Sequence, residues 1–249
     1  MAGNDTDLFG YDKVPYPVRS DLLDAQRRAW RRIGKAGTWL TAYERVQVAR
    51  EARAGSCLLC HSRKAAISPY AITGIHDSLT SLPQPWIELI HCIVSNPDRL
   101  TQSWSKRVRI SGITDEEYVE IVGIIATVTA VDTFAKAIGA DPWPLPGPAP
   151  GDPTRYRPNE ARQHEAWLPH IAWDEHGPLE TDYFQGNPAN IRMALTLVPD
   201  EARSFFDLVA HQYLPGPAMR DFEREHRAIS HAQIELVAGR VSAINQCEY

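Results

Sequence analysis

Cysteine is scarce in this chain: only four of the 249 residues are cysteine, at positions 57, 60, 92 and 247. This number excludes a small scaffold held together by disulfides, so an apolar core must stabilise the fold, and 43% hydrophobic residues are enough to build one. Long basic runs are also missing, and 26 Lys and Arg against 31 Asp and Glu give a formal net charge of −5. A mildly acidic chain of this kind is not expected to bind nucleic acid.

Membrane and export signals are missing as well. The first residues are polar and acidic, without the basic start and apolar run of a secretory signal. The most apolar stretch, residues 121–131, is too short to cross a bilayer and contains two threonines and a glycine. We therefore expect a cytoplasmic protein without membrane contact.

Alternating β-branched patterns are absent, and apolar residues recur at helical spacing instead. Two helix starts are marked by capping boxes, Thr114 with Glu117 and Ser230 with Gln233. Helices are predicted over residues 20–34, 42–54, 86–93, 114–138, 190–197, 200–213, 217–228 and 230–244. The predicted fold class is all-α.

Proline is concentrated in one segment. Seven prolines lie between positions 142 and 158, a density that no helix or central strand tolerates. We interpret residues 141–160 as an extended linker between a helical unit at 1–140 and a second helical unit at 161–249.

One pair of cysteines has a spacing that suits thiol chemistry. Cys57 and Cys60 form a Cys-x-x-Cys motif directly after the predicted helix 42–54. At the start of a following helix, unpaired backbone N–H groups and the helix dipole stabilise a thiolate, and the spacing lets the two sulfurs close a disulfide. Arg63 and Lys64 follow Cys60 by three and four residues, on the same helical face, and would lower its pKa further. The motif therefore indicates thiol redox chemistry.

Three other interpretations of this motif stay open. Followed by His61, it matches the attachment string of c-type haem, but that chemistry belongs to exported proteins. A structural zinc site needs four ligands, and no second Cys/His pair has the usual spacing. The third interpretation treats both cysteines as small apolar residues buried in a helix. We predict no metal and no cofactor.

The last fifteen residues carry a more specific pattern. Glu235 precedes Cys247 by twelve positions, and the segment between them ends in Val-Ser-Ala-Ile-Asn-Gln. This resembles the signature of the AhpD-like alkylhydroperoxidase and carboxymuconolactone decarboxylase superfamily: Glu, eleven residues, Cys-x-x-Cys, three residues and His. The resemblance implies an AhpD-like helical bundle, with one complete unit in residues 1–140 and a second, C-terminally truncated unit in residues 161–249.

The second cysteine of that signature would stand at position 250, and the sequence stops at 249. Peroxidase-related members of the superfamily include selenoproteins, in which selenocysteine takes this position and its UGA codon is easily read as a stop. Our hypothesis is that the chain is such a protein, cut at that codon. The alternative is a natural terminus with Cys247 as an incidental residue.

The first unit resembles the superfamily less closely. Glu44 precedes Cys57 by thirteen positions, one more than the pattern, and Lys64 stands where a histidine is expected. Residues 111–117, Ser-Gly-Ile-Thr-Asp-Glu-Glu, fit the start of the family's long packing helix. The resemblance covers residues 20–140 and 187–249. Lys64 can stabilise a thiolate, but it does not easily shuttle a proton near neutral pH as the histidine of the pattern would.

The resemblance implies peroxide reduction. In the first unit, Cys60 would attack the peroxide and Cys57 would resolve the sulfenate, with Glu44 as the base and Glu51 as the alternative base. In the second unit, Cys247 would be the resolving residue. Glu235 would be the base of that site, and the attacking atom is absent from the chain as given.

The histidines are assigned ordinary roles. His91 is interpreted as a core residue, although it could face Cys60 across a helix pair. His61, His76 and His231 are interpreted as surface or capping residues.

The expected function is thiol- or selenol-dependent reduction of an organic hydroperoxide, regenerated by a dithiol reductant protein, in a homo-oligomer. One alternative is a carboxymuconolactone decarboxylase-like enzyme, which needs no Cys-x-x-Cys. The other is a non-enzymatic helical oligomer whose Cys57–Cys60 pair senses redox state.

Overall fold

The computed structural model describes residues 9–186 and 189–245, and these residues form nine α-helices and no strand. This confirms the all-α class. The helices are α1 (Ser20–Ile33), α2 (Ala42–Ala54), α3 (Leu58–Ala65), α4 (Gln84–Ser95), α5 (Gln102–Ile110), α6 (Asp115–Ala137), α7 (Asn190–Met193), α8 (Pro199–Gln212) and α9 (His231–Ile244).

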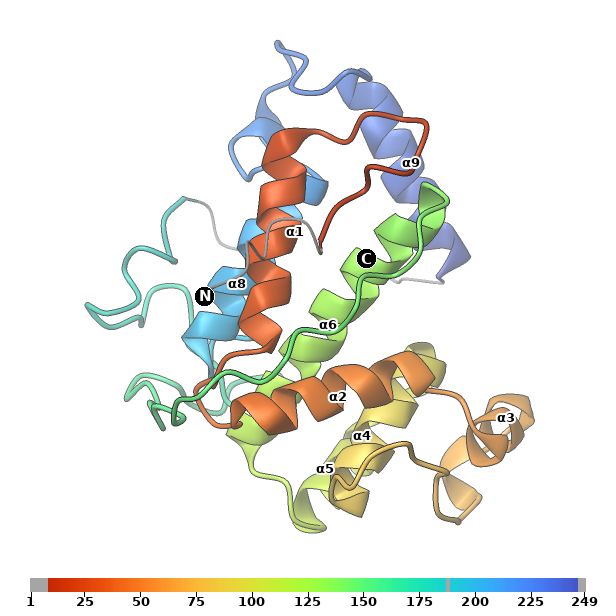
Figure 1. Cartoon of the computed structure of the whole chain (residues 1–249). Coiled ribbons are helices and arrows are strands. Elements are labelled where there is room, and N and C mark those ends of the chain that lie inside the picture. The colour runs from red at the N-terminus through yellow and green to blue at the C-terminus, as the bar shows by residue number, and fades with distance from the viewer. Residues whose placement is uncertain (1–8, 187–188, 246–249) are drawn as a thin grey trace.

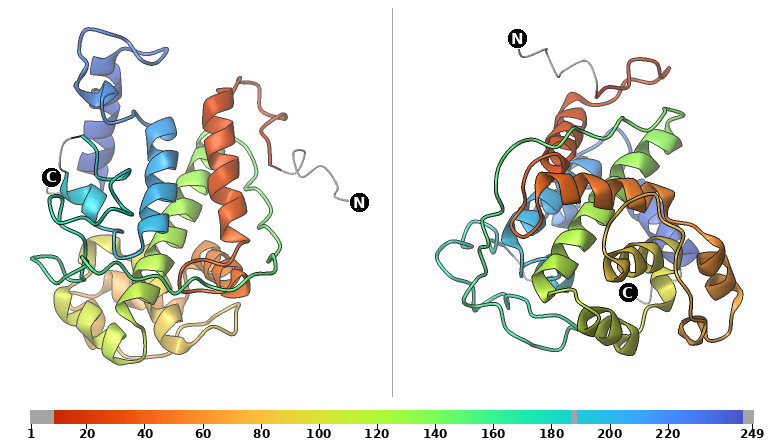
Figure 2. Two further views of the ribbon diagram at one scale, coloured as in Figure 1. Left: turned by 90° about the vertical axis from the view of Figure 1, so that its left-hand side faces the viewer. Right: turned by 60° about the horizontal axis from the view of Figure 1, so that its bottom comes forward.

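The long helix α6 is the centre of the arrangement. In Figure 1 it runs diagonally through the molecule, with α2, α3, α4 and α5 in the lower part and α1, α8 and α9 in the upper part. Helices α2, α4, α8 and α1 all contact α6, and α1 also packs closely along α8 (Figure 2). The main apolar core lies between these helices and includes Trp30, Ile90, Trp104 and Ile121, all nearly inaccessible to solvent.

Local signals explain where several helices begin. Thr114 accepts a hydrogen bond from the Glu117 backbone and the Glu117 side chain bonds back, which confirms the predicted capping box of α6. Ser230 and Gln233 do the same for α9. Both helices therefore begin at the predicted position.

The prediction was wrong over residues 217–228. Only a short 3-10 turn forms there, at Ala218–Arg220. Asp221 then accepts the Glu223 backbone N–H at 3.2 Å, which favours a turn over a helix. Arg227 donates to the backbone carbonyls of Ala210 and Tyr213 and ties this segment to the end of α8. Helix α7 also ends at Met193, earlier than predicted, and α5 was not predicted.

The proline-rich segment is extended, as predicted, but it is firmly attached to the helices. The indole of Trp30 donates to the Pro144 carbonyl at 2.8 Å, and the indole of Trp143 donates to Gly10 at 3.0 Å. After this segment the chain returns, and α8 packs against α1 and α6.

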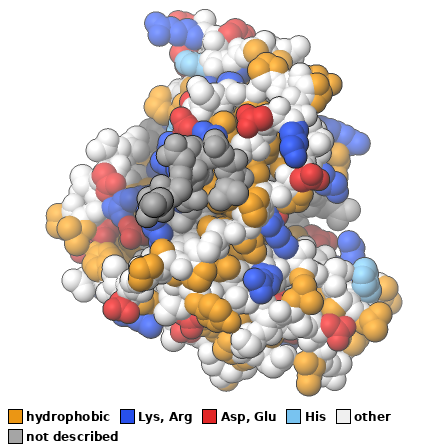
Figure 3. All heavy atoms as spheres, in the orientation of Figure 1, with side chains coloured by type: hydrophobic (Ala, Val, Ile, Leu, Met, Phe, Trp, Pro, Cys, Tyr) orange, Lys and Arg blue, Asp and Glu red, His pale blue; other side chains and the backbone are white. Residues whose placement is uncertain are grey.

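Helix α6 is long and apolar enough, by length and composition, to cross a membrane. It is also mostly buried among other helices of the chain. This environment is that of a core helix. On the face of the molecule drawn in Figure 3, positively and negatively charged side chains are intermixed.

A buried ion cluster joins α2, α6 and α8. Arg45 of α2 donates to Glu120 of α6 and, at 2.7 Å, to Glu201 of α8. Arg32 of α1 also donates to Glu201, at 2.7 Å. Burial raises the pKa of Glu120, whereas the two arginines outweigh burial at Glu201 and lower its pKa.

Candidate functional site

Two buried thiols lie where α2 ends and α3 begins. Gly55 allows the close passage between these helices, because a Cβ there would lie 2.5 Å from a methyl carbon of Val94 in α4. Cys57 is extended and precedes the first residue of α3, and Cys60 is the third residue of the helix. Their Sγ atoms are 3.5 Å apart, and the side chains are 8% and 2% exposed. The two thiols are therefore close enough to form a disulfide after a small movement.

Two histidines from distant parts of the chain face these thiols. The Nδ1 atom of His91, on α4, lies 3.4 Å from Cys60 Sγ. The Nδ1 atom of His76, in the irregular segment before α4, lies 3.2 Å from Cys57 Sγ and 3.4 Å from Cys60 Sγ. Both imidazoles are buried. We call Cys57, Cys60, His76 and His91 the cysteine–histidine cluster.

Each imidazole is held on its far side by a carboxylate. His91 Nε2 lies 2.7 Å from Glu51 Oε1, and Glu51 of α2 is fully buried. The other oxygen of Glu51 accepts hydrogen bonds from Ser78, at 2.8 Å, and Thr80, at 2.7 Å. These bonds anchor the irregular segment that carries His76.

The second carboxylate is equally well supported. His76 Nε2 lies 2.9 Å from Glu88 Oε2, on α4. Arg63 donates to both oxygens of Glu88 at 2.9 Å, and the Trp104 indole donates to Oε1 at 3.0 Å. Cys92, the third buried free thiol, contacts Glu88 and Arg63. Two Glu–His pairs thus converge on two thiols.

These contacts favour a thiolate. Burial alone would raise the pKa of Cys60, but hydrogen bonds from His76 and His91 outweigh it and lower the pKa to about 5. Burial alone would raise the pKa of Cys57 too, but hydrogen bonds from the Cys60 backbone and from the two imidazoles outweigh it and lower the pKa. In return, the surrounding thiols and carboxylates outweigh burial and raise the pKa of His76 to about 12 and that of His91 to about 9.

The glutamate expected as the base lies elsewhere. The carboxylate of Glu44 accepts hydrogen bonds from the backbone and hydroxyl of Thr41, both at 2.8 Å, and so caps α2. The alternative, Glu51, is the carboxylate that reaches the cluster through His91. Residues 44 and 51 are seven apart, so they occupy similar faces of α2, two turns from each other.

The basic residues and histidines near the motif also differ from expectation. Arg63 turns inward to Glu88, while Lys64 is exposed. The interpretation of His76 as a surface or capping residue was wrong, because it is 4% exposed and contacts both thiols. His231 is buried too, whereas His61 is exposed and bonds Ser56 at 3.0 Å.

Of the two residues expected in the second site, only Glu235 lies in the described part of the chain. Glu235 lies on α9, where it accepts a hydrogen bond of 2.5 Å from the Tyr213 hydroxyl and lies 3.4 Å from His231 Nε2. Cys247 falls outside the described residues. The described part of that site therefore contains a glutamate that accepts a hydrogen bond from a tyrosine and lies near a histidine.

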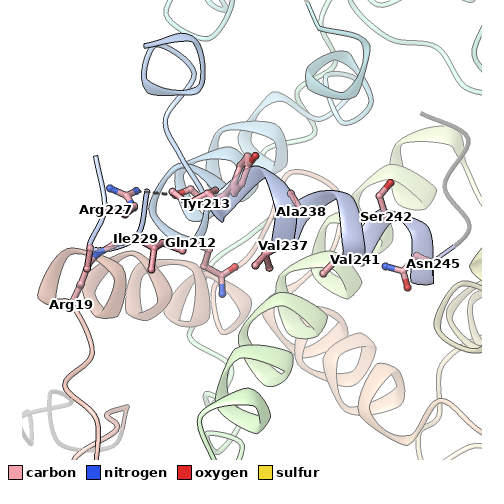
Figure 4. Close-up of a pocket in the computed structure, with 12 residues that line it drawn as sticks. Arg19, Gln212, Tyr213, Arg227, Ile229, Val237, Ala238, Val241, Ser242 and Asn245 are labelled. Carbon is pink, nitrogen blue, oxygen red and sulfur yellow. Dashed lines mark hydrogen bonds between the residues drawn. The ribbon is translucent and has the colours of Figure 1, made fainter. Parts of the chain in front are cut away.

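A separate apolar hollow of about 740 Å³ lies beside α9. Val237 and Val241 line it, and Figure 4 shows Arg19 and Arg227 at one end and Asn245 at the other. No residue that lines it in the described part of the chain belongs to the cysteine–histidine cluster.

Sequence reasoning missed the cluster because its histidines follow Cys60 by 16 and 31 residues, which is no recognised motif spacing. One signal was available: His91 interrupts the apolar pattern of the helix that also carries Cys92. No protein-family model matches the chain, and no curated protein or solved structure matches it, so its chemistry is inferred from the geometry of the cysteine–histidine cluster.

Proposed function

We propose that the chain reduces organic hydroperoxides, with Cys60 as the attacking thiol and Cys57 as the resolving thiol. The observation that carries this proposal is the chain of contacts from Glu51 through His91 to Cys60, beside a second thiol 3.5 Å away. A nucleophile, a base and a group that orients the base are what activated thiol catalysis requires. The resemblance of the sequence to the AhpD-like superfamily supports the same chemistry.

The reaction needs no group beyond the peroxide and a reductant. The Cys60 thiolate attacks one peroxide oxygen, the O–O bond breaks, and the leaving alkoxide takes a proton from the His91 imidazolium to become an alcohol. Cys60 is then a sulfenic acid. The Cys57 thiol attacks its sulfur, forming the disulfide and releasing water. A dithiol reductant protein reduces the disulfide and is itself oxidised.

The surface around the cluster favours an organic peroxide. Leu58 follows Cys57, Ile75 precedes His76, and Leu79 donates its backbone N–H to Glu51. These three side chains are between 71% and 78% exposed. An apolar rim of this kind can bind the alkyl part of a hydroperoxide.

The cellular setting follows from the same chemistry. We infer a cytoplasmic protein, since reductants there keep thiols such as Cys57 and Cys60 reduced. We also infer a homo-oligomer. Helix α9 exposes Leu236, Val237 and Ile244 by more than half of each side chain, and such a face is typically covered by a partner.

The direct test is turnover by the purified full chain. With tert-butyl hydroperoxide and a dithiol reductant, we expect catalytic peroxide consumption, and mass spectrometry should find a Cys57–Cys60 disulfide after one equivalent of peroxide. A chain that forms no disulfide and consumes no peroxide would refute the proposal. A redox-dependent change in assembly size without turnover would favour the sensing alternative.

Replacing each of the two candidate bases by glutamine gives a sharper prediction. Glu51→Gln should slow peroxide reduction by roughly 10- to 100-fold, because the amide no longer stabilises protonated His91, which is part of the acid–base contribution. Glu44→Gln is the matched control on the same helix. It should keep full activity and change the free energy of unfolding by no more than about 0.5 kcal/mol, because a glutamine can also close a capping box, as Gln233 does at the start of α9.

Steady-state rates and urea unfolding of both variants separate these roles. Glu51→Asp should recover part of the lost rate, since a carboxylate is retained. Equal activity of Glu51→Gln and Glu44→Gln would exclude Glu51 from the relay.

A further inference from the structure

We propose that the cysteine–histidine cluster binds one Zn²⁺ ion in the reduced protein, through the Sγ atoms of Cys57 and Cys60 and the Nδ1 atoms of His76 and His91. This inference goes beyond peroxide reduction, and the metal site itself does not depend on it. All four ligand atoms lie within 4.8 Å of one another, and all four residues are buried.

The spacing of the ligand atoms is close to that of a zinc tetrahedron. Bond lengths of about 2.3 Å to sulfur and about 2.0 Å to nitrogen give edges of roughly 3.8 Å between two sulfurs and roughly 3.5 Å between sulfur and nitrogen. The Sγ atoms of Cys57 and Cys60 are 3.5 Å apart, three sulfur–nitrogen distances to His76 and His91 are 3.2–3.4 Å, and all four ligand atoms lie within 4.8 Å of one another. These four distances differ from the edges of the tetrahedron by only a few tenths of an ångström.

The far sides of both imidazoles are arranged as metal-binding histidines require. Glu88 and Glu51 lie 2.9 and 2.7 Å from the Nε2 atoms of His76 and His91. A carboxylate in this place accepts the Nε2 proton and leaves the Nδ1 lone pair free for a metal. Ligating histidines in metalloproteins almost always have such a partner, and here both have one.

Charge and ligand type select the metal. Two thiolates balance the two charges of the ion, and their protons leave to solvent. Two sulfur and two nitrogen ligands in a tetrahedron favour Zn²⁺ over Mg²⁺ or Ca²⁺, which prefer oxygen. The protein supplies all four ligands, so the site is closed and suits a structural ion that does not bind substrate.

The metal would have two consequences. It would tie the irregular segment around His76 to α3 and α4, and it would cover both thiols. The second consequence rests on the proposed function: a metal-bound Cys60 should react with peroxide more slowly than the free thiolate.

Cobalt is the probe for this site, because tetrahedral Co²⁺ absorbs visible light and its thiolate complexes absorb in the near ultraviolet. We expect the reduced, chelator-treated full chain to bind one equivalent of Co²⁺ with both absorptions, and one equivalent of Zn²⁺ to displace it. Cys57→Ser should reduce the thiolate absorption by about half. Glu88→Gln should weaken metal binding by about 10- to 100-fold, because it removes the carboxylate behind His76.

His61→Gln is the matched control, since His61 adjoins Cys60 in sequence but points to Ser56. It should bind Co²⁺ like the parent chain, while His76→Gln should lose the tetrahedral spectrum. Absence of one-equivalent Co²⁺ binding by the parent chain, or equal loss in the two histidine variants, would overturn the metal site. Peroxide turnover by the metal-free chain is measured separately, so that turnover without metal binding refutes only the metal site, and metal binding without turnover refutes only the peroxidase.

Discussion

Replacement of Cys60 by serine should reduce peroxide turnover to the uncatalysed background, a loss of roughly three orders of magnitude or more, as expected when a nucleophile is removed. Serine is close to cysteine in size, but its hydroxyl stays protonated at neutral pH and is a much weaker nucleophile than a thiolate. The contacts of Cys60 to His76 and His91 make it the better activated of the two thiols.

Cys57→Ser distinguishes attack from resolution. This variant should still reduce one equivalent of peroxide per chain, because Cys60 is intact, and should then stop as a sulfenic acid that no neighbouring thiol resolves. Stopped-flow peroxide consumption and trapping of the sulfenic acid by dimedone check this. A full single turnover in Cys60→Ser, with none in Cys57→Ser, would reverse the two roles.

Replacement of Arg45 by methionine should destabilise the fold by about 3–5 kcal/mol, because it leaves buried carboxylates without their shared partner. Glu120 and Glu201 are almost fully buried on either side of Arg45. Arg50 lies on the same helix, is exposed, and supplies the matched control. Arg50→Met should change the free energy of unfolding by no more than about 0.5 kcal/mol.

The pH dependence identifies the cause. Without Arg45, burial holds the pKa of Glu120 above its unfolded value, while Glu201 keeps Arg32, so the folded chain binds more protons than the unfolded chain. The deficit of Arg45→Met should therefore shrink as the pH falls toward the ordinary glutamate pKa of about 4.3. Urea unfolding at several pH values measures this, and a deficit that stays constant would point to lost packing rather than unpaired charge.

Local signals made much of the fold predictable. The predicted ranges 42–54 and 114–138 agree with α2 and α6 because their limits are set by nearby residues: Thr41 and Thr114 cap the starts, and glycines follow the ends. The helix predicted over residues 217–228 does not form. The Asp221 side chain accepts the Glu223 backbone N–H and fixes a turn there, and Arg227 donates to a backbone carbonyl of α8.

The site was less predictable. The Cys-x-x-Cys motif gave the thiols, but the histidines come from tertiary packing that places α4 and the segment before it against α3. Glu44 matched the sequence pattern more closely than Glu51, yet a capping bond to Thr41 occupies its carboxylate. The positions of Glu44 and Glu51 along α2 could not show which of them lies beside His91, because this depends on which turn of α2 faces α4.

The hydrogen bond from Trp104 to Glu88 places a fluorescent side chain next to the cysteine–histidine cluster. This indole is 1% exposed and stacks on Tyr70, so its fluorescence is shielded from solvent and responds to local charge. Oxidation of Cys57 and Cys60 to a disulfide removes the thiolate charge beside His76. Because His76 and the Trp104 indole both bond Glu88, this changes the electrostatic field at the indole. We expect a shift in emission on adding peroxide that Trp104→Phe abolishes, which would let the redox state of the intact chain be followed without a label.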